Sequence, residues 1–83
     1  MKKADRIDLF RHDLLEGLEG IDDNAPFEEE ATKLVISLVA IYKLEKLLPD
    51  YKIVEKTESG KTDRHLERND VPLKKEEYAL ILS

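Results

Sequence analysis

The chain has 83 residues, of which 40% are charged and none is cysteine, and its formal net charge is −5. This length predicts one small domain, residues 1–83, that buries about 60–65% of the surface of its unfolded chain. The hydrophobic fraction of 41% is too high for a disordered chain. The lack of cysteine excludes a disulfide framework, a thiolate zinc site and a cysteine nucleophile.

The N-terminal sequence predicts a soluble, cytoplasmic protein. Lys2 and Lys3 are not followed by the apolar stretch that a signal peptide requires. The longest apolar run, 34–42, is interrupted only by Ser37 and is much shorter than the ~20 residues that span a bilayer. We therefore expect no membrane partner.

A first helix is expected over residues 5–19, because apolar side chains recur there at spacings of three and four. These side chains form a single stripe: Ile7, Phe10, Leu14, Leu18 and Ile21. Gly17 lies inside this helix, where glycine is less favourable than alanine by about 1 kcal/mol.

A second helix is expected over residues 26–48. Pro26 suits a first helical turn, and the three glutamates that soon follow suit the positive end of the helix dipole. The run 34–42 is rich in β-branched residues, which favour strands, but its flanks are strong helix formers in continuous phase with it. Because its centre is apolar nearly all round, this helix should be covered on more than one side. Helix 5–19 can cover one face, and a C-terminal sheet or a partner chain can cover the rest.

The apolar period changes to two after Pro49, which predicts strands over 51–57 and 63–68 with a turn at Gly60. The segment 77–82 fits either a strand or a short helix. A strand is favoured, because the sheet needs an apolar member to cover the second helix. The sequence thus predicts an α+β domain, with two N-terminal helices on a small antiparallel sheet of two to three strands.

One segment shows a family resemblance. The sequence LERNDVPLKKEEYALIL, residues 66–82, resembles the hairpin-then-helix segment of OmpR-type winged-helix effector domains, where a leucine and a glutamate open the first helix. The resemblance covers about 17 residues and implies a helix over 74–82. No recognition helix follows in the chain, so the resemblance implies no DNA-binding function.

Patterns for nucleotide and calcium binding are incomplete. The sequence SGKT at 59–62 matches the end of a phosphate-binding P-loop, but Glu55 stands where the first glycine is required. A calcium loop that starts at Asp22 would have Phe27 at its glycine position and Lys33 at position twelve, where glutamate is required. Neither ligand is expected.

Metal binding and catalysis are also not expected. Asp63, His65 and Glu67 alternate along the second strand and leave one face of it, an arrangement that suits a divalent ion. Neighbouring arginines make a solvated, charged strand face the better interpretation. No serine, histidine and aspartate arrangement is evident, so the sequence predicts no enzyme, no cofactor and no metal site.

Acidic and apolar side chains on the second helix are the candidate partner-binding groups. The acidic cluster at its N-terminus complements the helix dipole, and it is also a candidate surface for a basic or DNA-binding protein: Asp22, Asp23, Glu28, Glu29 and Glu30. The apolar stripe is a candidate homodimer interface: Leu34, Leu38, Ile41 and Tyr42.

The leading hypothesis is a small non-enzymatic protein-interaction module. Such a regulator, inhibitor or antitoxin-like factor, of the type found in phages and mobile elements, acts by binding a partner protein of unknown identity. The alternative is a nucleic-acid-binding accessory protein that contacts its ligand with Lys61, Arg64 and Arg68 of the C-terminal hairpin. Nucleic acid is disfavoured, because the hairpin also carries acidic residues and the N-terminal half is acidic.

Overall fold

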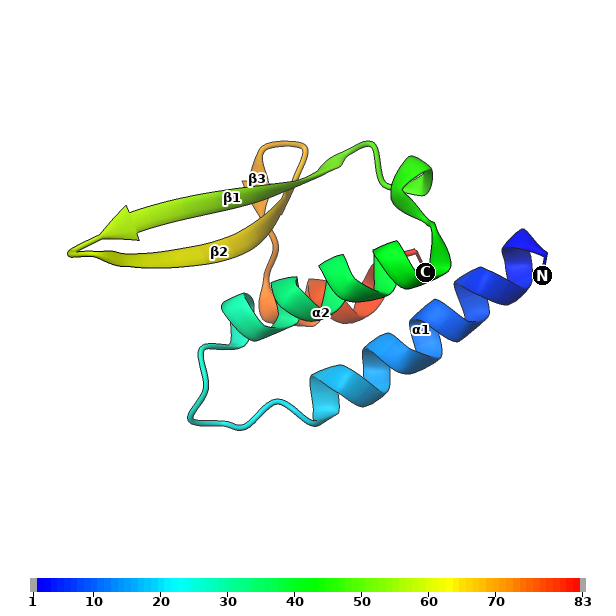
Figure 1. Cartoon of the computed structure of the whole chain (residues 1–83), viewed down its shortest axis with the longest axis horizontal. Coiled ribbons are helices and arrows are strands. Elements are labelled where there is room, and N and C mark those ends of the chain that lie inside the picture. Colours follow the sequence, from blue (N-terminus) through cyan, green and yellow to red (C-terminus); the bar gives the residue numbers. More distant parts are fainter. Residues whose placement is uncertain (1, 83) are drawn as a thin grey trace.

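Figure 1 shows the computed structural model, which describes residues 2–82. The elements follow one another as α1 (Lys3–Glu19), α2 (Phe27–Tyr42), η1 (Glu45–Leu47), β1 (Tyr51–Glu58), β2 (Lys61–Arg68), β3 (Val71–Pro72) and η2 (Lys75–Leu80). The α-helices form an antiparallel pair, η1 and η2 are 3-10 helices, and the strands form one antiparallel sheet in the order β1-β2-β3. The predicted α+β class, with two N-terminal helices and a small antiparallel sheet, is confirmed.

The two long helices approach closely at Gly17. A Cβ atom at this position would lie 2.5 Å from Cδ2 of Leu34, so the glycine provides the space that this leucine occupies. At the other end of the pair, Nη1 of Arg6 donates to the carbonyl of Tyr42 at 3.2 Å and to that of Lys43 at 3.4 Å. The guanidinium thereby satisfies carbonyl groups at the negative end of the α2 dipole.

Helix α2 ends at Tyr42, so the expected continuation to residue 48 is wrong. Lys43 adopts a left-handed conformation with φ 56°, and the N–H of Leu44 donates to the carbonyl of Val39 at 3.0 Å. This is the geometry of a Schellman cap, in which the residue after the left-handed one often packs on the helix it has left. Leu44 is only 1% exposed, so its burial accompanies the chain reversal.

Tight turns join the strands. Ser59 and Gly60 both have positive φ, which is the type I′ geometry that matches the twist of a hairpin. Asn69 and Asp70 also have positive φ and connect β2 directly to β3. The third strand is therefore Val71–Pro72.

The expected strand over 77–82 is wrong, because this segment overlaps the 3-10 helix η2. The N–H of Lys74 donates to the Glu77 carboxylate at 2.9 Å, which closes the first turn of η2. Tyr78 inside η2 and Ile81, the residue that follows η2, are both fully buried. The helix that the family resemblance implied in this region is confirmed over Lys75–Leu80.

The core lies where α1, α2, β2 and η2 meet. Its buried hydrophobic side chains are Phe10, Leu14, Ala31, Val35, Leu38, Leu44, Leu66, Leu73, Tyr78 and Ile81. The Tyr78 hydroxyl accepts the backbone N–H of Leu66 at 3.1 Å and lies 3.5 Å from Oγ1 of Thr32, which ties η2 to β2 and α2. Among residues 2–82, the structure contains no helix with the length and apolar character needed to cross a membrane.

Candidate functional site

The two strands of the hairpin relate differently to the helical layer. β2 packs against α2, and its Leu66 belongs to the core. The Glu29 carboxylate of α2 accepts the backbone N–H of Arg64 and lies 3.5 Å from its Nε. This backbone hydrogen bond, followed by the nearby positive charges, lowers the pKa of Glu29 below its ordinary value. β2 is thus fixed to the helices by apolar and charged contacts.

β1 is largely exposed and forms one edge of the sheet. A two-residue hairpin loop closes on a hydrogen-bonded pair, here Glu58 with Lys61, and such pairs alternate along an antiparallel ladder. The even-numbered residues of β1 therefore bond to β2. The N–H and C=O groups of Ile53, Glu55 and Thr57 point to the free edge. Tyr51 follows this pattern, because its N–H donates to the Leu48 carbonyl at 3.2 Å and not to β2.

An open groove of about 370 Å³ lies between β1 and α2. Its walls are mainly apolar side chains from α2, η1, the residue that follows η1 and the two long strands: Val35, Ile36, Val39, Ala40, Glu45, Leu48, Tyr51, Lys52, Ile53 and Leu66. Ile53 is 49% exposed although it stands opposite the buried Leu66 across the hairpin. We call this feature the α2–β1 groove. It presents apolar surface beside an unpaired strand edge.

The acidic residues at the start of α2 do not form one free surface. Glu29 forms an ion pair with Arg64, and Oε1 of Glu30 lies 3.7 Å from Nζ of Lys33. Oδ1 of Asp22 accepts the backbone N–H of Asn24 at 2.9 Å within the α1–α2 loop. The remaining two residues of the predicted cluster, Asp23 and Glu28, are exposed.

The four residues predicted for self-association mostly have roles within the chain. Leu38 is 7% exposed in the core, and Leu34 packs against Gly17. The Tyr42 hydroxyl donates to the carboxylate of Asp13 on α1. Of the four, Ile41 is free to meet a partner, because the residue is 65% exposed.

The basic residues predicted for nucleic-acid contact lie among acidic neighbours. Arg64 is held by Glu29, and the Arg68 guanidinium lies over the Tyr51 ring at 5.6 Å. Lys61 pairs with Glu58 next to the turn. Every cross-strand pair of charged residues combines opposite signs: Lys52 with Glu67, Glu55 with Arg64, Lys56 with Asp63 and Glu58 with Lys61. The hairpin therefore stabilises itself through its charges and has no continuous basic stripe.

The three β2 residues whose arrangement suits a divalent ion, and for which no metal site was expected, form local pairs in the structure. Nε2 of His65 lies 3.0 Å from Oε2 of Glu67, and the other Glu67 oxygen lies 3.9 Å from Nζ of Lys52. Asp63 stands opposite Lys56. Glu67 thus links two cationic or polar neighbours within the sheet.

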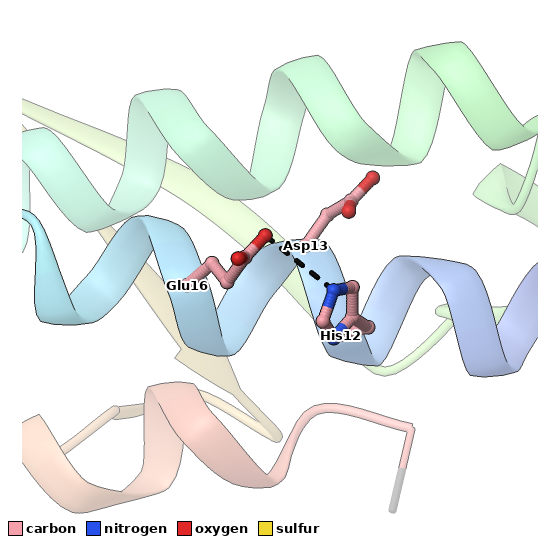
Figure 2. Close-up of side chains that lie close together, drawn as sticks. All are labelled: His12, Asp13 and Glu16. Carbon is pink, nitrogen blue, oxygen red and sulfur yellow. Dashed lines mark ion pairs between the residues drawn. The ribbon is translucent and has the colours of Figure 1, made fainter.

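A different group of side chains with potential metal-ligand atoms meets on α1: His12, Asp13 and Glu16, with one such atom of each within 4.8 Å of the others. Figure 2 shows His12 and Glu16 facing each other along the helix, 3.5 Å apart, while Asp13 points toward α2. The hydrogen bond to Asp13 raises the pKa of the Tyr42 hydroxyl. This set suits a divalent ion in chemistry, but His12 and Glu16 are exposed and Asp13 is engaged in tying α1 to α2.

Comparison of the chain with protein families, with curated proteins and with solved structures gives no match. The candidate site is therefore defined by its own geometry. Sequence reasoning missed the α2–β1 groove, because its apolar residues look like core residues in the sequence. The spacing of His12 and Glu16, four apart on a predicted helix, is the signal that would have indicated their pairing.

Proposed function

We propose that the chain is a small non-enzymatic protein-interaction module, a regulator or inhibitor that acts by occupying the surface of a partner protein. The α2–β1 groove is the observation that carries this proposal. Binding sites in proteins are usually concave and mostly apolar, with a few polar groups on their walls. Here the apolar walls come from three elements, and Ile53 stands half exposed among them.

The charge of the molecule favours a basic partner. The net charge is −5, and Asp23 and Glu28 remain exposed near the start of α2. Charges at the rim of an interface mainly raise the association rate, whereas apolar contacts at its centre supply most of the affinity. We therefore assign the central contact to the groove and a steering role to these carboxylates.

A matched pair of variants tests the groove. Ile53→Asp places a charge inside the groove, and Val71→Asp places the same charge on β3, where the side chain is exposed and does not line the groove. The tagged wild-type chain and both variants are used as bait in extracts of the source cells. A specific partner should bind the wild-type chain and Val71→Asp and be lost with Ile53→Asp.

Equal recovery by Ile53→Asp and Val71→Asp would contradict the proposal, as would the recovery of no protein by the wild-type chain. The two-dimensional NMR spectrum of each variant shows that a lost partner reflects the lost surface and not an unfolded bait.

A further inference from the structure

We propose that the partner enters the α2–β1 groove as an extended segment and adds a strand to the free edge of β1, an inference that rests on the proposed protein-binding function. The N–H and C=O groups of Ile53, Glu55 and Thr57 point to this edge, and within residues 2–82 no strand lies beyond it. An incoming strand would satisfy these groups. Backbone hydrogen bonds then supply affinity, while pockets for alternate side chains supply specificity.

The side chains fit the same arrangement. The β1 residues with outward backbone groups are the odd-numbered ones, and the Ile53 side chain lines the groove. A strand beside β1 would lie about 4.8 Å away and would direct every second side chain toward the same face of the sheet. Those side chains would reach Ile36, Val39 and Ala40 on α2. The ligand should therefore be apolar at alternate positions.

The charges around the groove favour a ligand that carries a basic residue beside its apolar positions. Glu45 borders the groove on η1, whereas the Lys52 ammonium is engaged by Asp70 and Glu67. Within the described part of the chain, residues 2–82, no ion pair involves Glu45, so its carboxylate is a negative charge at the rim. A lysine or arginine next to the apolar positions of the ligand would meet it.

A segment of a different protein suits this edge better than a second copy of the chain. In a pairing of two β1 strands, the residues facing the grooves would include Glu55 and Thr57 beside Ile53. Burial of Glu55 in this interface is costly, because its cross-strand neighbour Arg64 is already paired with Glu29. Two copies with a net charge of −5 each would also repel one another.

The test uses a phage-displayed library of random dodecapeptides, selected on the whole wild-type chain. Glu55→Pro removes one outward N–H and leaves the even-numbered residues that bond to β2 unchanged, a replacement that an edge strand tolerates. Glu55→Ala is the matched control, because it removes the same carboxylate and keeps the N–H. Selected peptides should be apolar at alternate positions and bind Glu55→Pro about tenfold or more weakly than Glu55→Ala, as expected from a lost hydrogen bond and a steric block.

Equal affinity of the selected peptides for Glu55→Pro and Glu55→Ala would overturn strand addition. So would peptides with apolar positions three and four apart, the absence of any enriched peptide, or a homodimer in light scattering that Glu55→Pro disrupts. In the extract experiment, a partner that is lost with Ile53→Asp but retained by Glu55→Pro would leave the protein-binding function standing and remove strand addition alone.

A second measurement does not depend on the folding of the proline variant. N-methylation of every second residue of the best peptide removes the N–H groups along one edge, and methylation of the intervening residues removes them along the other. One of the two methylated peptides should lose binding to the wild-type chain and the other should keep it. Equal binding by both would contradict an added strand.

Discussion

β1 and β2 pair over all eight positions of each strand, yet only β2 belongs to the core. Leu66 of β2 is 4% exposed, whereas its cross-strand neighbour Ile53 is 49% exposed. β2 is held by α2 through Glu29 and by η2 through the Tyr78 hydroxyl. β1 is held mainly by its pairing with β2. One strand of the hairpin thus supports the fold, and the other is left to present an apolar groove and an unpaired edge.

The largest contrast is expected between truncations of the two facing side chains. Leu66→Ala should lower the free energy of unfolding by about 2–5 kcal/mol, because it opens a cavity in the core. This is a large part of the ~4–12 kcal/mol expected for a domain of this length. Ile53→Ala should cost less than about 1 kcal/mol, because its side chain is half exposed. Urea unfolding of both variants measures the difference. Similar decreases in the free energy of unfolding would contradict the different roles assigned to the two strands.

A smaller contrast concerns two tyrosines. Tyr78→Phe should lower the free energy of unfolding by about 1–3 kcal/mol, because it leaves the buried N–H of Leu66 on β2 without its acceptor. Tyr51→Phe on β1 removes the same atom from a half-buried ring that stacks with Arg68 and should change the free energy by less than about 0.5 kcal/mol. Thermal unfolding of the pair checks this, and an unchanged melting temperature for Tyr78→Phe would contradict the role of its hydroxyl.

The interaction of Glu29 on α2 with Arg64 on β2 predicts that the stability of the fold depends on pH. The folded state lowers the pKa of Glu29 below the ordinary carboxyl pKa of 4.5, so the ionised carboxylate stabilises the fold at pH values above 4.5. This contribution is lost as the pH falls through the lowered pKa. Glu29→Gln should therefore be less stable than the wild type at neutral pH and should lose less stability on acidification. Glu55→Gln on β1 should follow the wild-type curve, and a Glu29→Gln curve parallel to that of the wild type would refute this interaction.

The sequence predicts the helices and the main hairpin because their signals are local. The apolar period identifies α1 and the two long strands, and Gly60 marks the turn between them. The end of α2 was not predictable from Leu47 and Leu48, which continue the helical phase. The chain reverses at Lys43 because Leu44 is buried by tertiary packing.

The third strand was misplaced for a similar reason. The apolar residues after Glu77 have both a strand and a helix interpretation, and in the structure the buried Tyr78 lies in η2, where its hydroxyl bonds to β2. The α2–β1 groove was not predictable at all, since its residues are spread from Val35 to Leu66. Which of them stay exposed depends on which strand packs against α2, and that is a property of the assembled fold.

The open edge of β1 is tested most directly by amide hydrogen exchange of the chain, alone and bound to the partner or to the best selected peptide. In the free chain, the amides of Val54 and Lys56 should exchange slowly and those of Ile53, Glu55 and Thr57 quickly, because only the first set bonds to β2. Binding should slow the second set and leave the first unchanged. A complex in which Ile53, Glu55 and Thr57 still exchange as in the free chain would contradict the account.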